Sequence, residues 1–357
     1  MKLKNSALTA VLIIFACLLP GCAGQDVSRR SMVTALELEA LPQGWRLTVE
    51  YLKKTSAEEE QLYGIYQGEG RTYLEAIQRI EAKEGDILYL DSAKCLILEG
   101  IESKEELESI LLEVDRDGRV RPHVQILIGT GVLEEKTEET VSVGQQAESL
   151  MGGKLEGYAF SLKDAINALT APGRGGMLPV IALDDEACRL TGFMLMGEEK
   201  LTVIERAVGQ SLPVRFLHRE SFVLTEAAPG LYDVQMEGTR LSVKCRMSGG
   251  KPHYVLTASA NGYLRTAPSI GDRGDGKILE QIQKEIQESI VEEFAKMMET
   301  TVKGTGTDLF SLGKICSFRN PNQWKSIGKN WQVNLQDVEY EIVAKVKIED
   351  KRQVLGR

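Results

Sequence analysis

Cys22 is the residue whose position indicates the most specific chemistry. It follows the small residue Gly21, at the end of a segment that opens with Lys2 and Lys4 and is almost wholly apolar from residue 7 to residue 19. This run is shorter than the about 20 apolar residues that span a bilayer, and its positive start and small-residue exit are those of a secretory signal. A cysteine at this place is typical of a bacterial lipoprotein signal, in which a diacylglycerol is attached to the sulfur. We therefore expect residues 1–21 to be a signal peptide and Cys22 to be the lipidation site.

An ordinary cleaved signal and an uncleaved N-terminal anchor are the alternatives to lipidation at Cys22. The difference matters because one acyl chain holds a protein to a membrane only marginally, whereas two chains hold it stably. A diacylglyceryl cysteine supplies both chains at one site. No later segment approaches about 18 uninterrupted apolar residues. We expect the rest of the chain to be a folded body tethered outside the cytoplasmic membrane.

The other residues that could do chemistry do not form a known constellation. The three histidines, His123, His218 and His253, are isolated in the sequence, and surface or strand-edge positions are the simplest expectation for them. Neither GxSxG nor HExxH occurs, and no His or Cys spacing fits a zinc site. We therefore expect no catalytic residue, no metal and no cofactor.

Four cysteines remain once Cys17 is removed with the signal and Cys22 is lipidated. They are widely spaced and lie mostly in apolar runs: Cys95, Cys188, Cys245 and Cys316. Two disulfides are possible in an exported protein, but a chain of this length does not need them. Buried free thiols are the favoured interpretation, because free cysteine is among the most buried residue types.

Two glycine-rich stretches resemble ligand-binding loops only superficially. Residues 303–307 and the pair Gly313-Lys314 lack the GxxxxGK[ST] spacing of a phosphate-binding loop, so turns are expected. Residues 271–276 lack the acidic pattern of an EF-hand calcium loop. Asp275 is better interpreted as the N-cap of a helix that begins at Lys277.

The composition indicates an acidic globular protein. Of the 357 residues, 43% are hydrophobic and 27% charged, which is ordinary for a folded domain. The formal net charge is −9, and removal of Lys2 and Lys4 with the signal makes it −11. A protein with this negative charge is not expected to bind nucleic acid, or to bind anionic lipid through clustered basic residues. Membrane attachment is therefore expected to come mainly from the acyl chains.

The first half of the chain alternates between strand and helix patterns. Two alternating runs around Leu41-Pro42-Gln43-Gly44 predict a β-hairpin, and residues 134–144 predict a solvated loop. Thr72 and Ser103 each precede an apolar helical pattern and have glutamate three residues later, which predicts two capped helices. On the first, Leu74, Ile77 and Ile80 are expected to face the core. Strands are predicted at residues 87–90, 95–98 and 123–128, and a further helix at 161–171.

The second half is richer in strand patterns and contains the longest helical pattern. Strands are predicted at 179–183, 188–196, 201–204, 214–217, 231–236, 241–247, 254–262 and 338–348. Between residues 278 and 302, apolar residues recur every four positions and predict one long amphipathic helix. The glycine-rich stretch 172–176 is the best candidate for a break in the architecture.

These patterns together predict an α+β protein with mixed or antiparallel sheets and flanking helices, rather than a doubly wound parallel fold. We expect three consecutive domains after the signal peptide. They are an N-terminal α+β domain over 22–175, a β-rich middle domain over 176–250, and a C-terminal α+β domain with the long helix over 251–357.

Several passages, in this order, resemble the Ger(x)C family of spore germination lipoproteins. They are the cysteine-ended signal, the hairpin through Trp45–Val49, Glu69–Ile77, Cys95–Leu98 with Val114–Asp117, Gly304–Gly313, and Pro321–Trp324 before a final amphipathic strand. The third is similar to the family's small-Gly-Arg-Thr helix start, and the fifth to its "D-hydrophobic-F-x-x-G" landmark.

The resemblance implies a three-domain α+β fold and a place on the outer face of the spore inner membrane. It also implies assembly with two integral-membrane subunits of a nutrient germinant receptor, without enzymatic activity. The alternative is an extracytoplasmic solute-binding lipoprotein that captures a nutrient in a deep cleft. An extracellular hydrolase is disfavoured because no catalytic constellation is visible.

Overall fold

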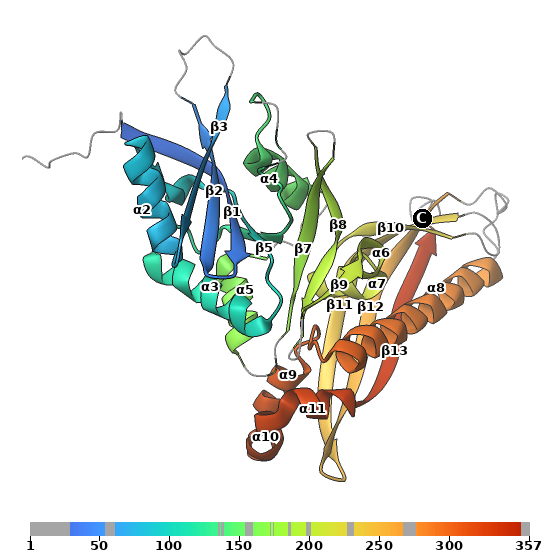
Figure 1. Cartoon of the computed structure of the whole chain (residues 1–357). Coiled ribbons are helices and arrows are strands. Elements are labelled where there is room, and N and C mark those ends of the chain that lie inside the picture. The colour runs from blue at the N-terminus through green and yellow to red at the C-terminus, as the bar shows by residue number, and fades with distance from the viewer. Residues whose placement is uncertain are drawn as a thin grey trace, which may run out of the picture.

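The computed structural model describes residues 29–53, 61–134, 136, 139–153, 160–171, 173, 175–184, 187–197, 201–226, 232–266 and 276–350. These residues form two sheets with flanking helices, which confirms the α+β class (Figure 1). The division into domains at residues 175 and 250 stays a prediction.

The first sheet has the strand order β3-β2-β1-β5-β6-β7-β8-β9, with β4 paired to β1. Its strands are β1 (Arg30–Leu41), β2 (Gly44–Leu52), β3 (Tyr63–Gly70), β4 (Ile87–Tyr89), β5 (Cys95–Glu99), β6 (Gln125–Ile128), β7 (Met177–Asp184), β8 (Ala187–Met196) and β9 (Leu201–Glu205). The central strands β1, β5, β6 and β7 run parallel, and antiparallel strands flank them on both sides. The sheet is therefore mixed, and it continues past the glycine-rich stretch at 172–176.

Helices cover both faces of this sheet. One face packs against α2 (Tyr73–Glu84), α3 (Lys104–Asp117) and α5 (Leu162–Thr170), and the other against α4 (Val143–Gly153). The predicted caps are confirmed, because Thr72 and Ser103 accept hydrogen bonds from the backbone N–H groups of Glu75 and Glu106. Leu74 was expected in the core but is 43% exposed. Tyr73 occupies the buried position instead.

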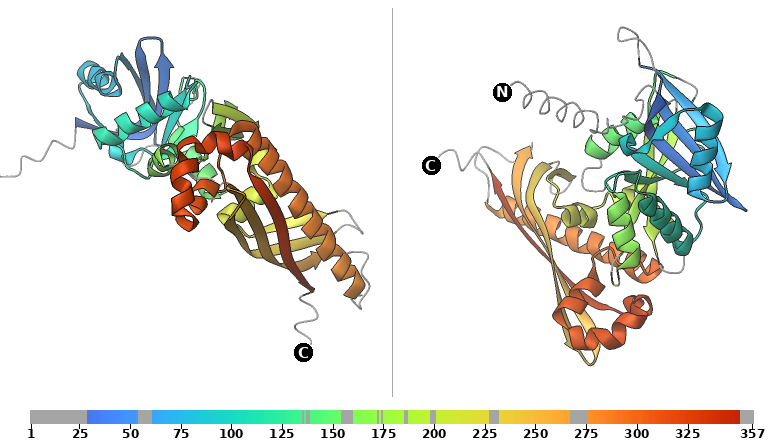
Figure 2. Two further views of the ribbon diagram at one scale, coloured as in Figure 1. Left: turned by 90° about the horizontal axis from the view of Figure 1, so that it is seen from below. Right: turned by 90° about the vertical axis from the view of Figure 1, so that its left-hand side faces the viewer.

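The second sheet has the order β10-β11-β12-β13. Its strands are β10 (Phe222–Glu226), β11 (Tyr232–Ser248), β12 (Lys251–Thr266) and β13 (Glu339–Asp350). The long helix α8 (Gly276–Met297) lies along one face of it, as both views in Figure 2 show. The predicted four-residue stripe is buried there, through Ile282, Ile286, Ile290 and Phe294. The helix continues as the π-helix η3 (Met298–Lys303).

Four short helical segments follow η3 and pack at one end of the second sheet. They are α9 (Leu312–Arg319), α10 (Pro321–Ile327), the 3₁₀ turn η4 (Gly328–Asn330) and α11 (Trp331–Gln336). Trp324 and Trp331 join them, with ring centroids 5.2 Å apart. The sequence patterns did not predict these four helical segments. In the first sheet they also missed strand β3, and they assigned the start of α4 to a loop.

Two strand predictions in this half need correction. Residues 214–217 were expected to be a strand but belong to helix α7 (Leu212–His218), which follows the short helix α6 (Arg206–Gly209). Pro213 near the helix start pre-sets a helical φ angle, and this outweighs the β-like apolar run. The runs 231–236 and 241–247 are one strand, β11, with a bulge around Gly238, whose φ angle is +61°.

Candidate functional site

The predicted lipidation site, Cys22, lies outside the residues that the structure describes, as do the signal at 1–21 and the predicted cap Asp275. Within the described ranges, no helix has the length and apolar character needed to cross a membrane.

The three histidines lie on different elements. His123 is exposed before β6, His253 is half-buried on β12, and His218 is half-buried at the end of α7. Burial lowers the pKa of His218 to about 4. Among the described side chains, no group of three or more His, Cys, Asp or Glu could hold a metal ion.

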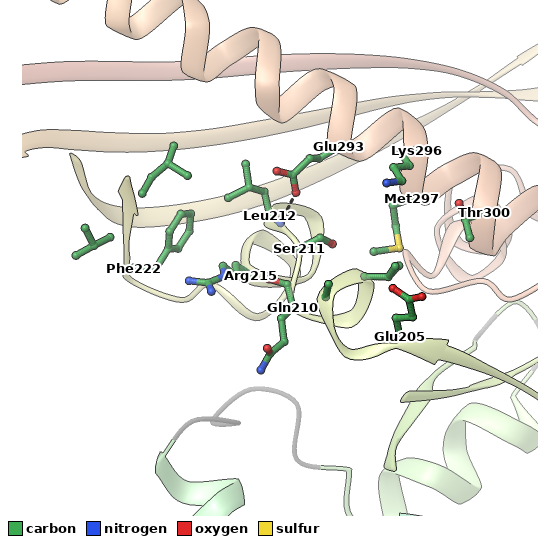
Figure 3. Close-up of a pocket in the computed structure, with 14 residues that line it drawn as sticks. Glu205, Gln210, Ser211, Leu212, Arg215, Phe222, Glu293, Lys296, Met297 and Thr300 are labelled. Atoms are coloured by element: carbon green, nitrogen blue, oxygen red, sulfur yellow. Dashed lines mark hydrogen bonds between the residues drawn. The ribbon is translucent and has the colours of Figure 1, made fainter. Parts of the chain in front are cut away.

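A cavity of about 510 Å³ lies between α6, α7 and β10 on one side and α8 on the other (Figure 3). Its apolar lining includes Leu212, Phe222 and Met297. Arg215 lies over the ring of Phe222, with its guanidinium carbon 5.0 Å from the ring centroid. No sequence pattern indicated this site, because its lining comes from segments about residues 205–224 and 293–300 that only the fold brings together.

Acidic, basic and uncharged polar side chains all border this cavity. Glu293 on α8 accepts a hydrogen bond from the backbone N–H of Leu212 at 2.9 Å, and Lys296 lies one turn further along α8. The hydroxyl of Ser211 is buried and has no hydrogen-bond partner among the described residues. Such a setting could hold a small molecule that carries both an acidic and a basic group.

Glu50 is a fully buried carboxylate that attaches α4 to the first sheet. It accepts hydrogen bonds from the Ser142 hydroxyl at 2.7 Å and from the backbone N–H groups of Val143 and Gly144 at 2.9 and 3.1 Å. Thr34 donates another at 2.7 Å, and the Nζ atom of buried Lys136 lies 3.4 Å away. A negative charge at a helix N-terminus is stabilised by the helix dipole. Glu50 therefore has a structural role.

Glu37 is the second buried carboxylate of the first sheet, only 2% exposed. It accepts hydrogen bonds from the backbone N–H groups of Val132 and Leu133 at 2.8 and 2.7 Å. Burial raises its pKa to about 7, and the nearby carboxylates of Glu99 and Glu134 act in the same direction. The two backbone bonds lower the pKa, but desolvation is the larger effect.

Asp308 gives the motif at Gly304–Gly313 a structural role. Its carboxylate accepts the backbone N–H groups of Leu312 and Gly313 at 2.7 and 2.8 Å, and so satisfies the start of α9. A side chain at Gly313 would not fit. Its Cβ atom would lie 2.4 Å from the Cα atom of Gly173 and 2.6 Å from Nε1 of Trp331. This stretch is thus a structural junction between the loop before β7 and the start of α9.

Comparisons with known proteins agree over most of the chain. Residues 24–183 match the family described as "Spore germination protein N-terminal domain", and residues 215–351 match "Spore germination B3/ GerAC like, C-terminal". A crystal structure of the GerBC protein is similar, with a TM-score of 0.55 and 13% sequence identity. The match covers 88% of this chain and 96% of that chain, and at this identity it shows a common fold. No curated protein matches the chain significantly.

Proposed function

The chain belongs to the Ger(x)C family of spore germination proteins, and we propose that it works as a lipid-anchored C subunit of a nutrient germinant receptor. The observation that carries this proposal is that the family's N-terminal and C-terminal regions both match, in the family's order. The role is to bind other receptor subunits at a membrane.

Acylation of Cys22 supplies the membrane attachment in this proposal. The diacylglycerol carries fatty acids such as palmitate and holds the folded body at the outer face of the spore inner membrane. The sequence supports this through the cysteine that directly follows Gly21 at the end of the apolar segment. Two acyl chains at one site are sufficient for stable anchoring.

The partners in this proposal are the integral-membrane subunits of the receptor, and the chain itself performs no catalysis. The family is not a known family of enzymes. The buried carboxylates of Glu37, Glu50 and Asp308 accept backbone N–H groups of the chain itself, as structural residues do.

The test of the anchor is the variant Cys22→Ala, with Cys17→Ala as the matched control. We expect Cys22→Ala to release the protein from the spore membrane fraction and to abolish the response to nutrients, and we expect Cys17→Ala to do neither. Intact mass of the native protein should show a diacylglyceryl group on Cys22. A Cys22→Ala protein that is free in solution and still supports a normal nutrient response would refute the anchor.

Partner binding is tested separately, by co-expressing the protein with the integral-membrane subunits of a germinant receptor and purifying it after detergent solubilisation. We expect the subunits to copurify in a fixed ratio. If the lipid-anchored protein purifies alone under conditions in which the other subunits stay together, the receptor-subunit role is wrong.

The cavity at Arg215 favours one second candidate, a solute-binding lipoprotein. The Ser211 hydroxyl, which has no hydrogen-bond partner in the described part of the chain, and the opposite charges at the rim suit a small nutrient such as an amino acid. Calorimetry with amino acids and sugars tests this, with Arg215→Ala as the binding variant and Arg189→Ala, on β8 and outside the cavity lining, as the control. Saturable heat that only Arg215→Ala abolishes would support direct nutrient capture.

A further inference from the structure

Positive charge gathers at one end of the second sheet, although the chain as a whole carries a formal charge of −9. Residues 238–271 contain no Asp or Glu, and neither do residues 309–336. We define the basic end as the seven exposed cations around the β11–β12 turn and on α9 to η4. They are Lys244, Arg246, Lys251, Lys314, Arg319, Lys325 and Lys329.

The two segments that supply these cations are in contact. The side-chain amide of Asn320, between α9 and α10, donates to the sulfur of Cys245 on β11 at 3.5 Å. Trp324 on α10 packs against the same hydrophobic core as Met247 on β11. Figure 1 shows the turn between β11 and β12 beside α10. The seven cations therefore belong to one surface and not to two.

These cations form no close ion pairs within the described part of the chain. Among the described residues none of the seven takes part in a salt bridge, although Glu339 and Glu341 on β13 lie in register with Arg246 and Lys244 across β12. Exposed lysines elsewhere are paired, such as Lys284 with Glu288 and Lys347 with Glu349. The acidic residues nearest along the chain to the helical half are Asp308 and Asp337. Asp308 is buried and directed at backbone N–H groups. Unpaired charges of one sign produce a local potential that attracts an anionic surface.

Phe318 is an exposed aromatic residue on α9, between the basic residues Lys314 and Arg319. Its side chain is 86% exposed, although large apolar residues are usually buried. It lies on α9 four residues after Lys314, so the two share one face of the helix, and Arg319 follows it directly. Basic residues together with an exposed aromatic residue are the composition of segments that lie in the boundary between lipid head groups and acyl chains.

We propose that the basic end binds the anionic phospholipid head groups of a bilayer, with the Phe318 ring entering the head-group boundary. A lipid surface fits better than an acidic peptide for two reasons. The cations are spread over the five elements β11, β12, α9, α10 and η4, and the cavities at Glu293 and at Gln287 are lined by none of them. A broad charged surface with one projecting aromatic ring matches a plane of phosphates more closely than it matches a single extended chain.

This contact is a second membrane attachment that does not depend on the acyl chains of Cys22. The proposal departs from the expectation, drawn from net charge alone, that basic residues do not attach the protein to anionic lipid. The overall charge is acidic, but the charges are unevenly distributed, and binding depends on the local potential.

The test uses the chain from residue 22 onward with Cys22→Ser, so that neither an acyl group nor the apolar segment at residues 7–19 can mask the contact. Binding is measured by sedimentation with vesicles of phosphatidylcholine alone and with vesicles in which about one third of the lipid is phosphatidylglycerol. We expect roughly tenfold or more tighter binding to the anionic vesicles in about 50 mM salt, and loss of most of this preference in about 0.5 M salt.

Two variants locate the contact. Replacement of Lys314, Arg319, Lys325 and Lys329 by Glu should abolish the preference for anionic vesicles. The matched control replaces Arg71, Lys83, Lys163 and Lys277 by Glu. These four are also exposed, but they lie on other elements, and they change the net charge by the same amount. The control should keep most of the preference. Phe318→Ala should weaken binding severalfold while the salt dependence stays, because it removes apolar contact and no charge.

Equal binding by the two charge-reversed proteins, both folded by circular dichroism, would overturn the proposal. So would an absence of preference for anionic vesicles in the parent chain. If no protein binds the vesicles and only reversal at the basic end prevents copurification with the integral-membrane subunits, the occupant is an acidic protein segment and the lipid proposal is wrong. Since every chain in the vesicle assay carries Cys22→Ser, its result is independent of the anchoring test.

Discussion

Trp331 donates its indole N–H to Oδ2 of Asp308 at 3.1 Å, and both side chains are buried. The same carboxylate also accepts the backbone N–H groups of Leu312 and Gly313. Burial raises the pKa of Asp308 to about 6, although all three hydrogen bonds favour its charged form. One carboxylate thus holds the start of α9 against α11.

Trp331→Phe should lower the free energy of unfolding by about 2 kcal/mol, because the ring stays apolar but the buried carboxylate loses a donor. Urea unfolding followed by circular dichroism measures the change. Trp324→Phe is the control, since this half-buried ring packs on Trp331 without donating to a carboxylate among the described residues. Equal losses from the two substitutions would mean that packing, and not the hydrogen bond, accounts for the effect.

Glu50→Gln should destabilise the protein by about 3 kcal/mol, because it leaves buried Lys136 without a counter-charge and one backbone N–H of α4 without an acceptor. Hydrogen exchange should also show faster exchange in α4. The matched control is Glu69→Gln, which removes an exposed ion pair with Arg46 and should cost less than about 1 kcal/mol. Unchanged exchange in α4 would contradict the anchoring role of Glu50.

Glu37 should make the protein less stable as pH rises from 4.5 to 7. Its folded-state pKa of about 7 exceeds the ordinary value of 4.5, so the folded state binds more protons than the unfolded state in this window. The loss should be about 3 kcal/mol and complete above pH 7. Asp308 acts in the same direction below about pH 6, so the difference between the parent chain and Glu37→Gln is the quantity to measure. Parallel stability curves for the two proteins would refute the assignment.

Cys245 and Cys316 should form a disulfide when the folded protein is treated with oxidised glutathione. The two thiols interact, and the proximity of Cys245 lowers the pKa of Cys316 to about 7. Exchange would release two molecules of reduced glutathione and lower the protein mass by about 2 Da. Cys95 should stay unmodified, because burial raises the pKa of its thiol. Cys245→Ser should prevent the link, and a glutathione adduct on Cys95 in the folded protein would contradict the prediction.

Sequence patterns correctly predicted those helices whose start is marked by a capping residue. The helix starts after Thr72 and Ser103 were predictable because each cap bonds to a backbone N–H three residues later. Ser161 caps α5 in the same way, although its helix was predicted without this cap. Residues 214–217 were misassigned because so short an apolar run fits a buried strand as well as a helix. The α+β class was predictable because alternating and four-residue periodicities occur in separate runs.

The contacts that give the buried carboxylates their roles could not be predicted, because they join distant parts of the chain. Glu50 meets Ser142, 92 residues away, and Glu37 meets Val132, 95 residues away. A glutamate within an apolar strand was the only available signal, and it does not identify the partner. The cavity at Arg215 and the basic end likewise depend on the contact of α7 with α8 and of α9 with β11.

The close approach of Gly173 to Gly313 has a mechanical consequence. At this point the loop leading into β7 of the first sheet meets the helix that supports the second sheet, and a Cβ atom on either glycine would collide with the backbone of the other. The backbone N–H of Lys314 donates to the carbonyl of Gly173 at 3.0 Å and fastens the same spot. Even alanine at either position would push the two backbones apart and tilt one sheet relative to the other. The absence of a side chain at both glycines therefore sets the angle between the two sheets.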